Sequence, residues 1–160
     1  MAIAVFPGSF DPPTNGHVSI ISRAQKFFEK LDVVIAANSC KHSLFTIEER
    51  FDFLCEIAKP FPNVNVHICD ELIAEYAKKT GASVLLRGVR NSTDFSYEFE
   101  LSMINAHLNK NLETIFIPSE QKYLLVKSSV VKELAKYGSD ISNLVPDFVA
   151  NAIVKKMCRR

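Results

Sequence analysis

The chain has 160 residues, of which 48% are hydrophobic and 23% are charged, and its formal net charge at pH 7 is +1. This length and composition are typical of a globular protein, and they predict one domain over residues 1–160. A net charge so close to zero argues against a broad basic surface for nucleic acid or membranes, so any anion site must be a local cluster of cations.

The start of the sequence lacks the pattern of a secretory signal, and no apolar stretch is long enough to cross a bilayer. Its four cysteines form no C-x-x-C pair and have no histidines beside them at zinc-finger spacing. We therefore expect a cytoplasmic protein with free thiols, without a membrane partner and without a nucleic-acid partner.

Short apolar runs alternate along the chain with longer runs that place apolar residues on one helical face. The short runs predict buried strands at residues 2–6, 32–37, 64–68, 83–86 and 114–117. The longer runs predict helices at residues 16–28, after the capping box of Thr46 and Glu49, and at residues 71–79 and 94–108. In the last of these helices the residues expected to face the core are Phe95, Phe99, Met103 and Ala106.

The alternation of strands and helices predicts an α/β, Rossmann-like fold: a five-stranded parallel sheet with helices on both faces. The alternation stops after Pro118. We expect C-terminal helices beyond it, one from Ser128 or Ser129 to about Gly138 and another opened by Pro146.

The first strand leads into the segment PGSFDPPTNGH, residues 7–17. It is neither a GxGxxG fingerprint nor a P-loop, which argues against dinucleotide-dependent hydride transfer and P-loop kinase chemistry. Gly8 permits close approach of a ligand, Ser9 offers a hydroxyl, and the helix start with His17 can bind an anion. A proline-rich turn with a capping threonine and a surface histidine explains the same residues equally well.

Cations follow two other predicted strands. Lys41 comes after the second strand, and Arg87 and Arg90 flank Gly88 and Val89 after the fourth. Because the carboxyl ends of parallel strands meet at one edge of a sheet, we expect these side chains to converge on phosphate groups.

Two further segments carry weaker signals. Asp94, Glu98 and Asn105 share a polar stripe on one helix, which is either a solvated face or a set of acceptors for ribose, adenine or amide groups. Residues 123–129 (YLLVKSS) place hydroxyls at a helix start, which is either a phosphate site or a plain N-cap.

These motifs resemble a known family. PGSFDPPTNGH is similar to the signature of HxGH-type nucleotidyltransferases, in its T-x-G-H form. The run RGVRNSTDFSYEFE, residues 87–100, resembles the phosphopantetheine adenylyltransferases within them, as do Lys41 before FTIEER and the helix start SSVVKE. The likeness covers nearly the whole chain. Lys127 departs from it, because the family usually has a hydroxyl residue there.

The resemblance implies transfer of the adenylyl group of ATP to 4′-phosphopantetheine, giving dephospho-coenzyme A and pyrophosphate, in a magnesium-dependent homohexamer. Catalytic roles then fall on His17, Lys41 and Arg90. The residues implied for 4′-phosphopantetheine are Ser9, Lys41, Leu72, Ile73 and Arg87. Those implied for ATP are Ser9, Phe10, His17, Gly88, Val89, Arg90, Glu98, Tyr123, Leu124, Leu125, Val126, Lys127, Ser128 and Ser129. No residue is assigned as a metal ligand.

Two alternatives stay open. Nicotinate-mononucleotide adenylyltransferases and cytidylyltransferases share the GSFDP…GH start, although RGVR…DFSYE argues against both. A non-catalytic nucleotide-binding module could also retain the fold, although the intact His17, Lys41, Arg87 and Arg90 argue against it.

Overall fold

The computed structural model describes residues 2–37 and 43–157 of the chain. No helix within these ranges is long and apolar enough to cross a membrane. The strands are β1 (Ile3–Gly8), β2 (Lys30–Ala36), β3 (Val64–Cys69), β4 (Val84–Val89) and β5 (Glu113–Pro118). The helices are α1 (Asn15–Ala24), α2 (Ile47–Ala58), α3 (Ile73–Thr80), α4 (Ser92–Leu108), α5 (Ser128–Lys136) and α6 (Asp147–Met157), with a 3₁₀ turn, η1, at Gln121–Tyr123.

The five strands form one parallel sheet in the order β3-β2-β1-β4-β5, which confirms the predicted Rossmann-like fold. Strand order reverses beside β1, whose partners are β2 on one side and β4 on the other. In such sheets the crevice at the carboxyl end of the strands, at the reversal point, is the usual ligand site. The order therefore directs attention to the segments that follow β1 and β4.

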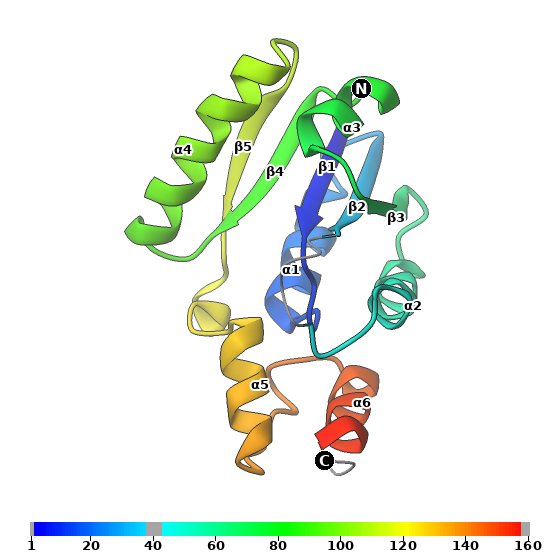
Figure 1. Ribbon diagram of the computed structural model, residues 1–160, viewed down its shortest axis with the longest axis vertical. Helices are drawn as coiled ribbons and strands as arrows, with labels where there is room; N and C mark the ends of the chain where they lie inside the picture. The colour runs from blue at the N-terminus through cyan, green and yellow to red at the C-terminus, as the bar shows by residue number, and fades with distance from the viewer. Residues whose placement is uncertain (1, 38–42, 158–160) are drawn as a thin grey trace.

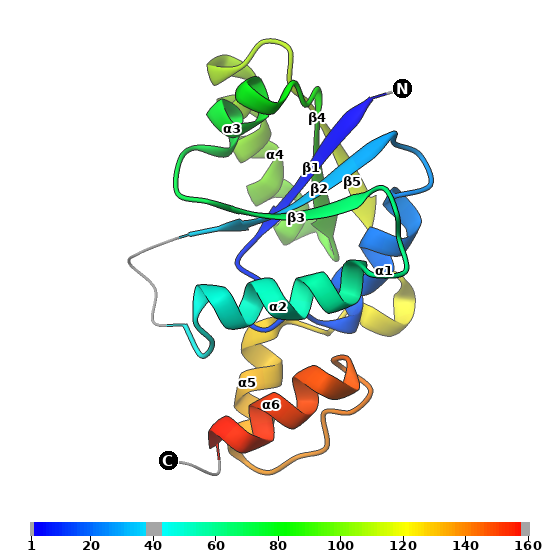
Figure 2. The same cartoon turned by 90° about the vertical axis from the view of Figure 1, so that its right-hand side faces the viewer.

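Helices cover both faces of the sheet, as predicted (Figures 1 and 2). Helices α1 and α2 pack on one face through Ile21 and Leu54, against a core that includes Leu31 and Leu86. Helix α3 packs on the other face with Val34 and its neighbours, and α4 lies beside it. The central strands β1 and β2 are buried along most of their length, which explains why they read as largely apolar runs in the sequence, whereas the edge strands β3 and β5 are partly exposed.

The C-terminal helices α5 and α6 form a separate layer beyond the end of the sheet to which β1 points (Figure 1). They share a third apolar cluster with Phe45, whose buried members also include Val126, Val131, Ile141, Val145, Val149 and Ile153. This layer closes one side of the crevice at the carboxyl ends of the strands.

Helix α4 differs from its prediction. The expected inward residues Phe95, Phe99 and Met103 are 43%, 48% and 61% exposed, Ala106 is exposed as well, and no residue of α4 is buried. The helix lies at the β5 edge of the sheet (Figure 1), where Phe95 meets Phe116 with ring centroids 5.0 Å apart. Its apolar residues are distributed around the helix, so helical periodicity could not identify one inward face.

Candidate active site

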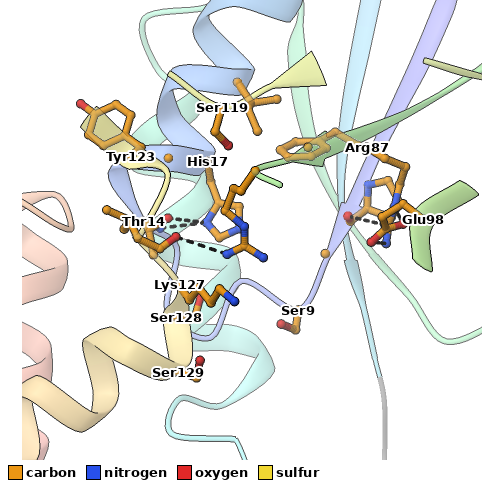
Figure 3. Close-up of a pocket in the computed structure, with 18 residues that line it drawn as sticks. Ser9, Thr14, His17, Arg87, Glu98, Ser119, Tyr123, Lys127, Ser128 and Ser129 are labelled. Atoms are coloured by element: carbon orange, nitrogen blue, oxygen red, sulfur yellow. Dashed lines mark hydrogen bonds and ion pairs between the residues drawn. The ribbon is translucent and has the colours of Figure 1, made fainter. Parts of the chain in front are cut away.

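A cavity of about 480 Å³ opens at the carboxyl ends of β1 and β4. Figure 3 shows His17 and the first turn of α5 on one side, Arg87 and Glu98 on the other, and Ser9 between them. Its lining consists of Phe6, Pro7, Gly8, Ser9, Thr14, Gly16, His17, Ile20, Arg87, Gly88, Arg90, Glu98, Ser119, Tyr123, Val126, Lys127, Ser128 and Ser129. The predicted convergence of strand ends therefore occurs for the residues the structure describes.

His17 is anchored by the residue that caps its own helix. The backbone N–H of Thr14 donates to Nδ1 of His17 at 3.0 Å, and the Thr14 hydroxyl oxygen lies 3.0 Å from the same nitrogen. This is a capping box in which histidine takes the place of the usual glutamate or glutamine. Because Nδ1 accepts a backbone proton, the proton of the neutral imidazole lies on Nε2.

Burial, and to a smaller extent the nearby charge of Arg90, together lower the pKa of His17 to about 4. The Phe10 ring packs against the imidazole with centroids 5.0 Å apart. At neutral pH the side chain is therefore a neutral N–H donor held in a fixed orientation.

The loop before α1 bends sharply under His17. Phe10 has a left-handed backbone with φ of 47°, and its side chain is only 1% exposed. Non-glycine residues seldom adopt this conformation, and it is found preferentially at functional sites. The bend places the Phe10 ring beneath the imidazole, while the neighbouring Ser9 lines the cavity.

Arg87 faces His17 across the cavity and is held by Glu98 of α4. Its Nε and one terminal nitrogen donate to the two Glu98 oxygens at 2.5 and 2.6 Å, a bidentate ion pair. The other terminal nitrogen donates to the Pro7 carbonyl at 3.2 Å. The guanidinium is thus oriented before any ligand binds, and its charge is neutralised by a carboxylate.

Arg90 has a similar arrangement. Its Nε donates to Asp94 at 2.6 Å, and a terminal nitrogen lies 3.4 Å from the Val126 carbonyl. The polar stripe of α4 therefore presents Asp94 and Glu98 to the two arginines. This explains why carboxylates occur on a helix that follows an arginine-rich strand end.

The first turn of α5 supplies the remaining polar groups. The Ser128 hydroxyl donates to the Pro12 carbonyl at 2.8 Å, while Lys127 is exposed and has no ion pair among residues 2–37 and 43–157. Free backbone N–H groups at a helix start favour an anion. Of the cavity's three cationic side chains, Lys127 is the one without a carboxylate partner in the described chain.

Gly88 occurs where α1 approaches β4 closely. A Cβ atom at this position would lie 2.4 Å from Cδ1 of Ile20. A larger residue at this position would force the Ile20 side chain, which also lines the cavity, to shift.

Several residues implied by the family resemblance do not line this cavity. Phe10, Val89, Leu124 and Leu125 are next to it in sequence but are not part of its wall. Leu72 and Ile73 lie at the start of α3, where Leu72 is 61% exposed. Lys41 lies outside the described residues. The structure leaves these assignments as predictions.

The cavity also includes Ser119, which our sequence reasoning missed. Its N–H donates to the Val89 carbonyl at 2.9 Å, directly after β5. The rule that ligands bind where parallel strands end would have identified it, because Ser119 follows the fifth strand as Arg90 follows the fourth.

The described residues hold no cluster of three or more histidine, cysteine, aspartate or glutamate side chains that could bind a metal ion. The carboxylate of the cavity wall belongs to Glu98, which is already paired with Arg87. This donor set does not fit a magnesium ion held in a protein cage. It fits an ion that stays on ligand phosphates and water, as magnesium often does.

Residues 5–134 match the family model described as cytidylyltransferase-like. The chain is 46% identical over 156 residues to a phosphopantetheine adenylyltransferase of Caldanaerobacter subterraneus subsp. tengcongensis, an alignment that covers 98% of each chain. It is 44% identical over 157 residues to the phosphopantetheine adenylyltransferase of Levilactobacillus brevis, again over 98% of each.

Solved structures with the same fold are more distant in sequence. A protein assigned as a nicotinate-nucleotide adenylyltransferase from Vibrio parahaemolyticus superimposes with a TM-score of 0.74 at 17% identity, over 100% of this chain and 97% of that one. The nicotinic acid mononucleotide adenylyltransferase of Plasmodium falciparum gives 0.64 at 14% identity, over 99% and 95%. These similarities establish the fold.

Proposed function

The chain belongs to the phosphopantetheine adenylyltransferases, within the cytidylyltransferase-like family, and we propose that its cavity transfers the adenylyl group of ATP to 4′-phosphopantetheine. The products are dephospho-coenzyme A and pyrophosphate. The observation that carries the proposal is the convergence of His17, Arg87, Arg90 and Lys127 on one cavity where two phosphate-bearing substrates must meet.

The reaction needs no protein nucleophile. A phosphate oxygen of 4′-phosphopantetheine forms a bond to the α-phosphorus of ATP, while the bond from that phosphorus to the bridging oxygen breaks and pyrophosphate leaves. Both reactants are anions, so the protein must align them and offset their repulsion. This is the task for which the polar groups of the cavity are suited.

His17 provides the fixed donor in this scheme. Its Nε2–H is directed to an oxygen of the reacting phosphate, where negative charge is redistributed in the transition state. The bond from Thr14 to Nδ1 keeps the proton on Nε2, and a neutral imidazole donates this hydrogen bond without delivering the proton, because its loss would leave an imidazolate anion. Nothing in the reaction requires the proton to move.

The family assignments divide the cavity between the substrates. The 4′-phosphopantetheine phosphate is placed against Arg87 and Ser9, together with Lys41, and its pantetheine arm runs toward Leu72 and Ile73. ATP occupies the side formed by residues 88–90 and 123–129, where Lys127 directly precedes α5 and Ser129 lies in its first turn. Magnesium carried on the ATP phosphates would offset the charge of the triphosphate on this side of the cavity, next to Arg90 and Lys127.

Pyrophosphate release from MgATP, with and without 4′-phosphopantetheine, tests the proposal. We expect release that depends on 4′-phosphopantetheine. Release with nicotinate mononucleotide instead would preserve the chemistry and overturn the substrate. ATP binding without release for any phosphorylated acceptor would favour a non-catalytic nucleotide-binding module.

We also propose that the chain assembles as a homohexamer in the cytoplasm. The surface of α4 supports assembly, because Phe99, Met103 and Ile104 are 48%, 61% and 55% exposed on one helix, and several large exposed apolar side chains on one element are typical of an interaction site. Free thiols at Cys55 and Cys69 are consistent with a reducing compartment.

Light scattering after size-exclusion chromatography tests the assembly. Met103→Lys should shift the mass toward smaller species. The control is Val154→Lys on α6, which introduces the same charge at a residue that is 54% exposed. An unchanged mass for Met103→Lys, or a monomeric wild type, would refute assembly through α4.

A further inference from the structure

Asp11 belongs to the first loop motif, but it does not line the cavity and has no role in the proposed chemistry. Its side chain is buried, with 5% of the residue exposed. One carboxylate oxygen accepts from the Phe45 N–H at 2.9 Å, and the other accepts from the Leu44 N–H at 2.9 Å. The second oxygen also accepts from the Lys132 ammonium at 2.9 Å.

These contacts join three parts of the chain that are far apart in sequence. Asp11 lies in the loop between β1 and α1, residues 44 and 45 precede α2, and Lys132 lies on α5. Every hydrogen bond is of normal length, and the carboxylate is surrounded by donors. Burial alone would raise the pKa of Asp11, but the bonds from Lys132, Leu44 and Phe45 outweigh it and leave the pKa lowered.

Lys132 lies one helical turn after Ser128, on the same face of α5. Both side chains bind adjacent residues of one loop: Ser128 donates to the Pro12 carbonyl at 2.8 Å, and Lys132 pairs with Asp11. Helix α5 is therefore attached to the loop at two points, and its first turn, which carries Ser128 and Ser129 of the cavity, is fixed relative to His17.

A second buried charge holds the same loop from the other side. Arg50 of α2 is 6% exposed and donates to the Ser9 carbonyl at 2.8 Å and to the Thr46 carbonyl at 3.2 Å. The loop that carries Ser9 is thus held between α2 and α5. The α5 attachment connects this loop to the wall formed by residues 127–129.

We propose that Asp11 and Lys132 form a positioning link that keeps the first turn of α5 in register with the Ser9–His17 loop across the cavity. The link rests on the proposed function, because its purpose is to hold the groups that align two phosphates. Displacement of such groups by about 1 Å can cost about 100-fold in rate. The link therefore affects turnover although neither residue lines the cavity.

The test compares three lysine variants of the full-length protein. Lys132→Met keeps the length of the side chain and removes its charge, and we expect kcat to fall about 30-fold while the Kd for MgATP changes less than about threefold. Lys132→Arg should recover most of the rate, because the guanidinium can pair with Asp11. The matched control, Lys136→Met, removes a lysine one turn further along α5, where it is exposed, and should leave kcat unchanged.

A double variant separates positioning from stability. Asp11→Asn and Lys132→Met remove the same link, so their combination should be at most about twofold slower than Asp11→Asn alone. Multiplicative losses would overturn the proposal. If Asp11→Asn fails to fold, the lysine series decides alone, measured well below the melting temperature of each variant. A loss of kcat that Lys132→Arg does not restore, or a fall in melting temperature with kcat unchanged, would also overturn it.

One further readout does not depend on the reaction. In Lys132→Met the Val131 amide, which donates to the Lys127 carbonyl at 2.9 Å in the first turn of α5, should exchange with deuterium at least 10-fold faster than in wild type. An unchanged exchange rate would refute the link. Wild-type protein without release that depends on 4′-phosphopantetheine would instead refute the proposed function, so the two failures are distinguishable.

Discussion

The two sides of the cavity prepare their polar groups in different ways. On the side of α1, His17 is neutral, and its ring is fixed by the cap of its own helix. On the side of α4, Arg87 and Arg90 carry full charges, but each charge is already paired with a carboxylate. The α1 side therefore presents an oriented neutral hydrogen-bond donor. On the α4 side, each arginine must bind a ligand while it is still paired with its carboxylate.

This difference suggests a division of labour. A neutral donor that needs no rearrangement is suited to the transition state, because it adds no reorganisation cost during the reaction. An arginine that is already paired with a carboxylate gains less binding free energy from a phosphate ligand. It binds the phosphate only where the phosphate oxygens match the orientation of its N–H groups. We expect changes to His17 to affect turnover, and changes to the arginine side to affect binding.

The largest expected effect comes from His17→Ala. It removes the fixed donor, and kcat should fall about 1,000-fold or more with a much smaller change in KM for either substrate. Pyrophosphate release measured at saturating substrates checks this. His107→Ala, an exposed histidine of α4, is the matched control and should be silent. Near-normal turnover in a folded His17→Ala protein would refute the assignment of His17 to turnover and of the arginines to binding.

The second effect concerns stability and pH. Because the pKa of His17 falls from 6.5 to about 4 on folding, the unfolded chain binds more protons than the folded one between these values. The contribution of the neutral, buried His17 ring to the free energy of unfolding is fully present above about pH 6.5 and is lost as pH falls toward 4. Over this interval, wild type should lose roughly 3 kcal/mol more unfolding free energy than His17→Gln. Urea titrations of both proteins measure the difference, and parallel pH profiles would show that the imidazole is charged in the folded state.

The third prediction tests whether Arg87 acts mainly in substrate binding. Arg87→Lys keeps the charge but cannot form the bidentate pair, so kcat/KM for 4′-phosphopantetheine should fall about 50-fold, mostly through KM. Arg23→Lys is the control, because Arg23 donates to the Pro118 carbonyl and does not line the cavity. A loss confined to kcat would show that Arg87, like His17, acts in the transition state and not in substrate binding.

The smallest effect tests what Glu98 does. If it mainly neutralises Arg87, Glu98→Gln should bind 4′-phosphopantetheine about fivefold more tightly, since the phosphate no longer competes with a carboxylate. Calorimetric titration with each substrate measures this, with exposed Glu100→Gln as the control. Weaker ATP binding in Glu98→Gln, with the other affinity unchanged, would instead assign Glu98 to ATP.

The sheet could be predicted from the sequence because its central strands β1 and β2 are buried and largely apolar, and because short apolar runs alternate with helical patterns along the chain. Helix boundaries were less accurate. The first helix was expected over residues 16–28, but it ends at Ala24, where the chain tightens into turns and Phe27 becomes 75% exposed. The inward face of α4 was predicted wrongly, because its apolar residues do not favour one side.

The sequence allowed a prediction of which residues meet in the candidate site, but not of the contacts among them. The backbone topology brings residues at the carboxyl ends of parallel strands to one edge of the sheet, independently of side-chain conformation. Ser9, His17 and Arg87 could therefore be placed together from the sequence. The pairing of Arg87 with Glu98 could not, because it depends on rotamers and on the path of α4. The link from Asp11 to Lys132 spans 121 positions, and no local pattern indicates it.

The hydrogen bond from the Thr14 amide to His17 begins a helix and also determines which imidazole nitrogen carries the proton. These two properties cannot change independently. Whenever the first turn of α1 frays, the ring loses the partner that fixes its tautomer. The exchange of this single backbone proton with solvent deuterium therefore records how often the resting protein leaves the arrangement that its chemistry requires.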